Sequence, residues 1–304
     1  MMSARFLTVV LERAFNMRDG FGREIDYMRI SVIDSCNLNC YYCNPCDNNE
    51  HCHALNILSV KEVLCIVRAA TRLGIKHFRL TGGEPLLHPQ LDEMVLQIKK
   101  IPGVSSVSLT TNAVLLAQHA KWLKEAGIDS INVSLDTIDA SEYERITKKP
   151  LLEEVKHGIN AAIECGIRVK INVVLTPQTD VVALTRYVAK KGTDIRFIEM
   201  MPVGEGHTNG VEPYKKVIGT LSKLYGEPCR INTEKTKEIN SGNDKRKIPD
   251  NGPAEYYIFP ELGIRVGLIQ AIHGKFCDTC NRIRVTADGR LMPCLGSSVT
   301  MDLV

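Results

Sequence analysis

The sequence predicts an α/β fold, in which a parallel sheet curls into a partial (β/α)6 TIM-like barrel and a small cysteine-bearing region follows. From Tyr27 onward, short apolar runs alternate with segments of helical periodicity, which is the pattern of repeated βα units. Gly74, Gly127 and Gly166 each follow one of the helical segments, as glycines at helix C-termini do. The 304 residues, 44% of them hydrophobic, are enough for one such barrel with an appendage.

The individual elements follow from these runs. Strands are predicted at Tyr27 to Val32, His77 to Leu80, Val107 to Thr110, Ser130 to Ser134, Arg168 to Val174 and Ile195 to Ile198. Helices are predicted near Val60 to Leu73, Leu91 to Lys100, Leu115 to Ala126, Leu152 to Cys165 and Val181 to Lys191. A barrel of this kind places its active site at the C-terminal ends of the strands.

Three regions are expected along the chain. Residues 1–16 precede the repeat and form an N-terminal extension, residues 17–224 form the partial barrel, and residues 225–304 form the smaller C-terminal region. The charged stretch from Thr233 to Asp250 is poor in apolar residues and is expected to be a solvated loop.

Composition restricts the class of protein. A net charge of +3 is too small to indicate nucleic-acid or membrane binding by charge alone. The longest N-terminal apolar run, Phe6 to Leu11, is interrupted at once by Glu12 and Arg13, so neither a signal peptide nor a membrane span is expected. We therefore expect a cytoplasmic protein, whose 11 cysteines are more readily metal ligands than disulfide partners.

The first cysteine triplet follows the first predicted strand. Cys36, Cys40 and Cys43 have the spacing C-x3-C-x2-C, and three thiolates on one loop suit three irons of a 4Fe-4S cluster with the fourth iron open. Structural zinc needs four ligands, so a zinc site would have to recruit an additional one. The candidates for that ligand, or for a third metal site, are Cys46, His51, Cys52 and His53.

This triplet, with Tyr42 before its last cysteine, resembles the signature of the radical S-adenosylmethionine (SAM) superfamily. The resemblance continues at Thr81-Gly-Gly-Glu-Pro85 after the second strand. In that family the Gly-Gly-Glu-Pro segment holds the amino group of SAM, which chelates the open iron. The resemblance therefore implies a radical SAM partial barrel with one 4Fe-4S cluster and SAM as cofactors.

The second cysteine triplet lies near the C-terminal end. Cys277, Cys280 and Cys294 again supply three ligands, and a zinc site with His273 as a fourth ligand is the alternative. With Asn281-Arg-Ile-Arg284 and Arg196-Phe-Ile-Glu-Met-Met-Pro202, this segment is similar to the GTP 3′,8-cyclases of molybdenum cofactor biosynthesis. In that family a second 4Fe-4S cluster binds the guanine. Family members commonly have glycine at the position of Ala113.

Several arginines are expected to point into the barrel. Arg282 and Arg284 alternate with apolar residues and so share one face of an extended segment, while Arg29 and Arg79 occupy strands. Arginine cannot lose its charge, so several inward cations need a polyanion such as a nucleoside triphosphate. The alternative for each single arginine is an ion pair with a carboxylate such as Glu199 or Asp136.

The resemblance also implies roles for individual residues. The expected GTP contacts are Arg29, Arg79, Thr110, Lys170, Arg282 and Arg284, with Arg29, Arg282 and Arg284 taken as catalytic, and the expected SAM contacts are Tyr42, Gly82, Gly83, Glu84, Ser134 and Met201. Implied partners are a reduced flavodoxin or ferredoxin-type electron donor, a downstream cyclic pyranopterin monophosphate synthase and a second copy of the chain as a homodimer.

Two alternatives stay open at this point. Family members usually carry a longer tail that ends in two glycines, whereas this sequence ends at Val304, so the sequence given is either shortened or belongs to a radical SAM enzyme for another nucleotide or a peptide. A non-catalytic metal-binding module that uses its cysteines for structure is the second alternative.

Overall fold

The computed structural model describes residues 17–43, 56–202, 210–231, 252–297 and 299–303. The expected N-terminal extension, the stretch from Thr233 to Asp250 and the Cys46, His51, Cys52 and His53 loop lie outside these ranges.

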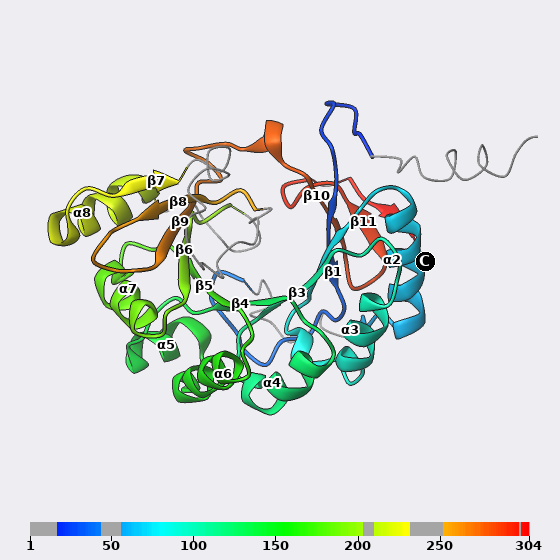
Figure 1. Cartoon of the computed structure of the whole chain (residues 1–304), viewed down its shortest axis with the longest axis horizontal. Coiled ribbons are helices and arrows are strands. Elements are labelled where there is room, and N and C mark those ends of the chain that lie inside the picture. Colours follow the sequence, from blue (N-terminus) through cyan, green and yellow to red (C-terminus); the bar gives the residue numbers. More distant parts are fainter. Residues whose placement is uncertain (1–16, 44–55, 203–209, 232–251, 298, 304) are drawn as a thin grey trace, which may run out of the picture.

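A single sheet of twelve strands runs through the described part of the chain. Its centre consists of six parallel strands in sequence order, which are β1 (Tyr27–Ser31), β2 (His77–Thr81), β3 (Ser106–Thr111), β4 (Ser130–Ser134), β5 (Val169–Val174) and β6 (Asp194–Ile198). The helices along the outer side of the curved sheet (Figure 1) are α2 (Val60–Arg72), α3 (Leu91–Lys99), α4 (Leu116–Glu125), α6 (Leu152–Glu164) and α7 (Val181–Lys190). This is the predicted partial (β/α)6 barrel.

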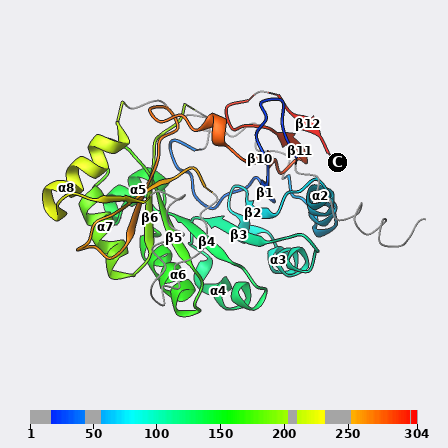
Figure 2. The ribbon, with the colours of Figure 1, turned by 45° about the horizontal axis from the view of Figure 1, so that its top comes forward.

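The C-terminal region extends both edges of this sheet. Beyond β6 lie β9 (Arg265–Ile269), β8 (Glu255–Ile258) and β7 (Cys229–Ile231), and beyond β1 lie β10 (Arg282–Val285), β11 (Arg290–Met292) and β12 (Met301–Asp302). β9 is parallel to β6 and β10 is parallel to β1. The sheet ends at β12 and β7 without closing. The segment 270–281 connects β9 to β10 and so crosses from one flank of the six-stranded centre to the other (Figures 1 and 2).

The core lies between the sheet and its helices. Strand residues that face outward, such as Phe78 and Ile131, are fully buried against buried helix residues such as Val67 and Met94. Burying an aliphatic or aromatic side chain of this size contributes about 1.5–3 kcal/mol. Because the outer face carries this packing, the inner face is free to carry polar and charged residues.

Two α-helices of the described part of the chain lie outside the predicted set. α8 (Gly219–Tyr225) packs beside α7, and α5 (Ala140–Thr147) is inserted between β4 and α6. No helix among the described residues is long and apolar enough to cross a membrane.

Candidate active site

The first cysteine triplet lies at the C-terminal end of β1, where Cys36 and Cys43 are exposed and Cys40 is half-buried. Burial raises the pKa of each of the three thiols, and nearby negative groups, Glu84 for Cys36 and Asp136 for Cys40 and Cys43, raise it further. For Cys40 the pKa rises to about 12, with the Asp136 carboxylate as the second cause. Metal binding at these residues therefore releases protons.

The Gly-Gly-Glu-Pro segment after β2 packs directly on the backbone that leads into this triplet. Gly83 N donates to Ile33 O at 2.8 Å, and Glu84 N donates to Ser35 O at 2.8 Å. A Cβ atom at Gly83 would lie 2.1 Å from Ser35 O, and one at Gly82 would lie 2.3 Å from Ile33 O. Glycine is required here because two backbones approach each other, a constraint that is independent of any contact with SAM.

Glu84 connects this segment to the end of β3. Its buried carboxylate accepts hydrogen bonds from Leu86 N at 3.0 Å, Thr111 Oγ1 at 2.7 Å and Asn112 N at 2.7 Å. Burial raises the pKa of Glu84, and these hydrogen bonds oppose the rise. The Asn112 side chain in turn donates to Asn37 Oδ1 at 2.7 Å and contacts Cys36 Sγ at 3.8 Å. Glu84 therefore fixes the cysteine loop through Asn112.

The C-terminal end of α5 holds the other side of the cysteine loop. Asn39 N donates to Thr147 O at 3.0 Å, and Tyr41 N donates to Ile146 O at 3.1 Å. Arg145 stacks over the Tyr41 ring at 5.5 Å. The last carbonyl groups of a helix have no hydrogen-bond donors within the helix. Here the N–H groups of the cysteine loop are those donors.

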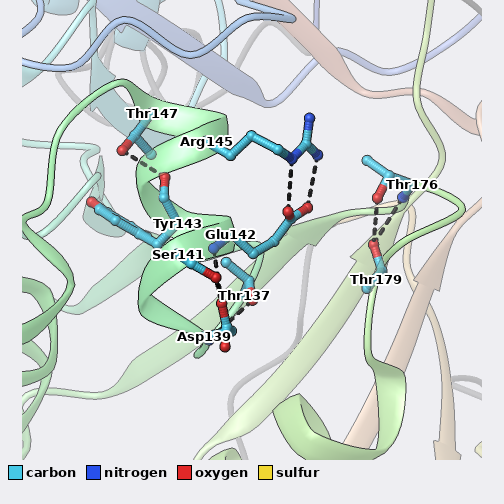
Figure 3. A network of polar contacts seen from close by, with 9 residues as sticks. All are labelled: Thr137, Asp139, Ser141, Glu142, Tyr143, Arg145, Thr147, Thr176 and Thr179. Atoms are coloured by element: carbon cyan, nitrogen blue, oxygen red, sulfur yellow. Dashed lines mark hydrogen bonds and ion pairs between the residues drawn. The ribbon is translucent and has the colours of Figure 1, made fainter.

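α5 itself is built from local polar contacts, which Figure 3 shows. Asp139 caps the helix by accepting from Glu142 N at 2.8 Å, and Glu142 pairs with both Nε and Nη2 of Arg145 at 2.7 Å. Thr176 and Thr179 close the neighbouring turn after β5, where Thr176 N donates to Thr179 Oγ1 at 2.9 Å. The Asp139 cap and the Glu142–Arg145 pair thus stabilise the helix whose last carbonyl groups contact the cysteine loop.

Four of the predicted SAM contacts follow different strands at the same end of the sheet. Tyr42 follows β1, Gly83 follows β2, Ser134 ends β4 and Met201 follows β6. Among them the structure fixes Tyr42 most firmly, because its hydroxyl donates to Asp136. Asp136 also accepts from Val174 N at 2.7 Å, and burial raises its pKa to about 6.

Three arginines form one row on adjacent strands. Arg284 of β10 is the register partner of Arg29 of β1, and Arg29 is the register partner of Arg79 of β2. Burial holds the pKa of Arg29 well below its usual range, and the charges of Arg284 and Arg79 lower it further. Arg282 lies next to the row, opposite Tyr27, with its guanidinium 5.3 Å from the Phe276 ring centroid.

Within the described part of the chain, no carboxylate forms an ion pair with Arg29, Arg79, Arg282 or Arg284. The two carboxylates considered for this role are used elsewhere. Glu199 binds His273, Ile272 N and His273 N, and Asp136 binds Tyr42 and Val174 N. Among the described residues the single-pair alternative is thus wrong for these arginines, and no carboxylate there balances the positive charge of the row.

Tyr27 lies beside this row and contacts it, although the sequence analysis gave this residue no role. Its hydroxyl accepts a hydrogen bond from Arg79 Nε, and Arg79 Nη1 lies 3.5 Å from Thr110 Oγ1. The pKa of Tyr27 is lowered because Arg79 and Arg29 outweigh the opposing effect of burial. The sequence did contain a signal for this contact, because residues two apart in a strand, such as Tyr27 and Arg29, lie on the same face. Lys170 is buried on β5, farther around the inner face.

The second cysteine triplet lies at the opposite end of the strands. Cys280 lies two residues before β10. Cys294 follows β11, which runs antiparallel to β10 and returns to the same end. The charges of the Cys294 and Cys280 thiolates act on Arg284, so this triplet adjoins the arginine row. Because β10 is parallel to β1, the row lies between the two triplets.

Both triplets have a donor set that suits an iron-sulfur cluster. Three thiolates bind three different irons of a 4Fe-4S cluster and leave one iron open for a ligand. In the ranges that the structure describes, no three His, Cys, Asp or Glu side chains gather around a point that would hold one metal ion. His273, the proposed fourth zinc ligand, places its Nδ1 against Glu199 instead.

Two family models match this chain. The radical SAM superfamily model matches residues 30–184, and the Molybdenum Cofactor Synthesis C model matches residues 193–304. A GTP 3′,8-cyclase from Clostridium perfringens is 37% identical over 92% of this chain and 83% of its own length. Another from Pelotomaculum thermopropionicum is 38% identical over 94% of this chain and 86% of its own length.

Solved structures support the fold. Streptococcus suis SuiB bound to its precursor peptide SuiA superposes with a TM-score of 0.65 at 15% identity, covering 98% of this chain and 65% of SuiB, so this chain spans less than two thirds of that protein. Native anSMEcpe with bound AdoMet has a TM-score of 0.59 at 17% identity, covering 90% of this chain and 75% of its own. The identity and coverage of the cyclase relatives, together with the superfamily match, show that this chain belongs to the GTP 3′,8-cyclase family of the radical SAM superfamily.

Proposed function

We propose that this chain reductively cleaves SAM and uses the 5′-deoxyadenosyl radical to convert GTP to (8S)-3′,8-cyclo-7,8-dihydroguanosine 5′-triphosphate in molybdenum cofactor biosynthesis. The observation that carries this proposal is the row of Arg284, Arg29 and Arg79, which lies between two cysteine triplets and has no carboxylate counter-charge among the described residues. A triphosphate supplies that counter-charge through bidentate guanidinium contacts.

The residues divide the work by position. The first cluster and SAM, when bound, supply the radical that abstracts a hydrogen from the substrate. Cys36, Cys40 and Cys43 would hold that cluster, Tyr42, Gly82, Gly83, Glu84, Ser134 and Met201 would orient SAM, and Cys277, Cys280 and Cys294 would hold the second cluster, which binds the guanine. Glu84 would act through the cysteine loop, because its carboxylate already accepts three protein hydrogen bonds.

The arginines would fix the substrate between these two ends. Arg29, Arg79, Arg282 and Arg284, with Thr110 and Lys170, would bind the phosphates and the ribose. Fixing the substrate in this way keeps the hydrogen that is removed close to the radical and excludes water from it. A peptide substrate would leave the arginine charge without a partner, so we favour a nucleoside triphosphate.

The decisive experiment uses anaerobically reconstituted protein with SAM, dithionite and GTP. The expected products are 5′-deoxyadenosine and a cyclised nucleotide in equal amounts, measured by liquid chromatography with mass spectrometry. Formation of 5′-deoxyadenosine without consumption of GTP would remove GTP as the substrate. Iron analysis should give about eight irons per chain, since two 4Fe-4S clusters are proposed, whereas zinc alone would favour a non-catalytic module.

The cellular context is also proposed. A reduced flavodoxin or ferredoxin-type protein would deliver the electron, and a cyclic pyranopterin monophosphate synthase would consume the product in the cytoplasm. Pull-down with each purified partner and analytical ultracentrifugation for a homodimer test these points.

A further inference from the structure

The chain before β1 forms a small hairpin, residues 17–26, that lies beside the second cysteine triplet (Figures 1 and 2). Arg18 and Glu24 pair across it as an antiparallel bridge. Asp19 Oδ1 accepts hydrogen bonds from Phe21 N and Arg23 N, both at 3.0 Å, so the turn itself fixes this carboxylate. The backbone of the hairpin therefore fixes the position of the Asp19 carboxylate.

Arg23 connects this hairpin to the cysteines. Its Nε and Nη2 lie 2.6 Å and 2.5 Å from Asp19 Oδ2, and its Nη1 donates to Cys277 O at 2.9 Å. Both side chains are only 20% exposed. The pKa of Arg23 is raised first by Asp19, and the Cys280 and Cys277 thiolates raise it further.

Asp19 lies on the side of Arg23 away from the cysteines. Asp19 Oδ2 contacts the Nε and Nη2 atoms of the guanidinium, whereas Nη1 points to Cys277 O. Two further contacts hold the hairpin and the cysteine segment together, since Asn281 Nδ2 donates to Asp26 Oδ1 at 2.6 Å and Tyr27 N donates to Asn281 O at 3.2 Å. The ion pair thus has a fixed direction, with its cation toward the thiolates.

We propose that the Asp19–Arg23 pair is a fixed dipole that raises the reduction potential of the 4Fe-4S cluster held by Cys277, Cys280 and Cys294. This inference rests on the second cluster of the proposed function. A one-electron reduction adds negative charge to the cluster, and nearby charge and hydrogen bonds set the potential of such clusters. Arg23 is a positioning and tuning residue for this cluster and takes no part in the chemical step.

Because the dipole has a fixed direction, substitutions at its two ends should shift the reduction potential of the second cluster in opposite directions. Arg23→Gln leaves the Asp19 carboxylate uncompensated, so the potential of the second cluster should fall. Asp19→Asn leaves the Arg23 cation uncompensated, so the potential should rise. Damage to the hairpin alone would shift the potential in the same direction in both variants, because both remove the same ion pair.

The measurement is a redox titration followed by electron paramagnetic resonance on the reconstituted full chain, together with its iron content. Arg18→Gln and Glu24→Gln are matched controls, because they remove an exposed ion pair of the same hairpin and should leave the potential unchanged. Shifts of the same sign, or no shift, in a protein with eight irons would overturn this inference alone. Four irons in the wild type would overturn the proposed second cluster as well.

The iron content of the variants at Arg23 separates the charge of this residue from its contact with Cys277 O. If Arg23→Gln loses the second cluster, Arg23→Lys, which keeps the charge, should retain it, and Asp19→Asn should still raise the potential. Loss of the cluster in Arg23→Lys together with an unchanged potential in Asp19→Asn would show that only the guanidinium contact with Cys277 O matters, and would overturn the dipole.

Discussion

Arg29 of β1 is the direct register partner of Arg284 of β10, so two guanidinium groups occupy adjacent strands in one partly buried row. Burial and the charge of Arg284 are the first two causes that hold the pKa of Arg29 well below its usual range. Like charges in such a place destabilise the ligand-free protein and become favourable only when an anion binds. Stability and substrate binding should therefore respond to substitution in opposite directions.

Arg29→Met tests this opposition. Replacing a partly buried charge that has no carboxylate partner among the described residues by an apolar side chain should raise the free energy of unfolding of the ligand-free protein by about 1–3 kcal/mol. The affinity for GTP should fall by about 2 kcal/mol or more, because a desolvated charge pair is lost. Urea denaturation and isothermal titration calorimetry measure the two quantities. Arg68→Met, at an exposed position of α2, should change neither, and a parallel loss of stability and affinity in Arg29→Met would contradict the argument.

Glu84→Gln should weaken the first cluster site from a distance. Both carboxylate oxygens of Glu84 accept hydrogen bonds, Oε1 from Leu86 N and Oε2 from Asn112 N. The glutamine side chain has only one oxygen, so its NH2 group must face one of these two N–H donors, which then has no acceptor. An unsatisfied buried donor costs about 1–3 kcal/mol, which should appear as a lower unfolding free energy. Iron bound by the first triplet should also decrease, because Asn112 holds the Cys36 loop. Glu93→Gln on the exposed face of α3 is the control, and unchanged iron content in Glu84→Gln would contradict this role.

The barrel was predictable because short strand segments, whose outward-facing residues are apolar, alternate with helical segments that are followed by glycine. The predicted strand Ser130 to Ser134 matches β4 at both ends, and His77 to Leu80 differs from β2 by one residue. Gly74 and Gly127 have φ values of +92° and +88°, as expected just after a helix. Local periodicity therefore determined the centre of the sheet.

Long-range pairing and short helices were not predictable in the same way. α5 has only eight residues and no periodic run long enough to signal a helix, and its value lies in the carbonyl groups of Ile146 and Thr147 that meet the cysteine loop. The alternation of Arg282 and Arg284 indicated a strand face, whereas the pairing of that strand with β1 joins segments far apart in the chain. The motifs thus indicated candidate site residues, while their order across the sheet needed coordinates.

Stability should fall in mild acid because of His88. The Nδ1 atom of this buried ring accepts from Gln90 N at 3.1 Å, so the proton of the neutral ring is on Nε2, which lies 3.0 Å from Leu58 O. Burial lowers the pKa of His88, so the unfolded chain takes up the proton first as the pH falls. The stabilising contribution is complete above about pH 6.5, the ordinary value, and is lost as the pH falls toward the lowered pKa. Urea midpoints between pH 7.5 and pH 5 should decline more steeply for the wild type than for His88→Gln, and equal slopes would contradict this.

Ala113→Gly should stabilise the protein at the point where the sequence departs from the family's glycine. Ala113 has a φ of +65°, a left-handed conformation that costs a non-glycine residue about 1–2 kcal/mol. Glycine removes this strain but adds conformational freedom to the unfolded chain, which costs about 0.4–1 kcal/mol, so the net gain should be roughly 0.5–1 kcal/mol. Its neighbour Asn112 keeps the contacts to Asn37 and Cys36, so iron content should not change. The unfolding free energy from urea denaturation measures the gain. Ala120→Gly inside α4 is the matched control and should destabilise, because glycine in a helix interior is unfavourable. A loss of stability in Ala113→Gly would show that the left-handed backbone is not the source of strain.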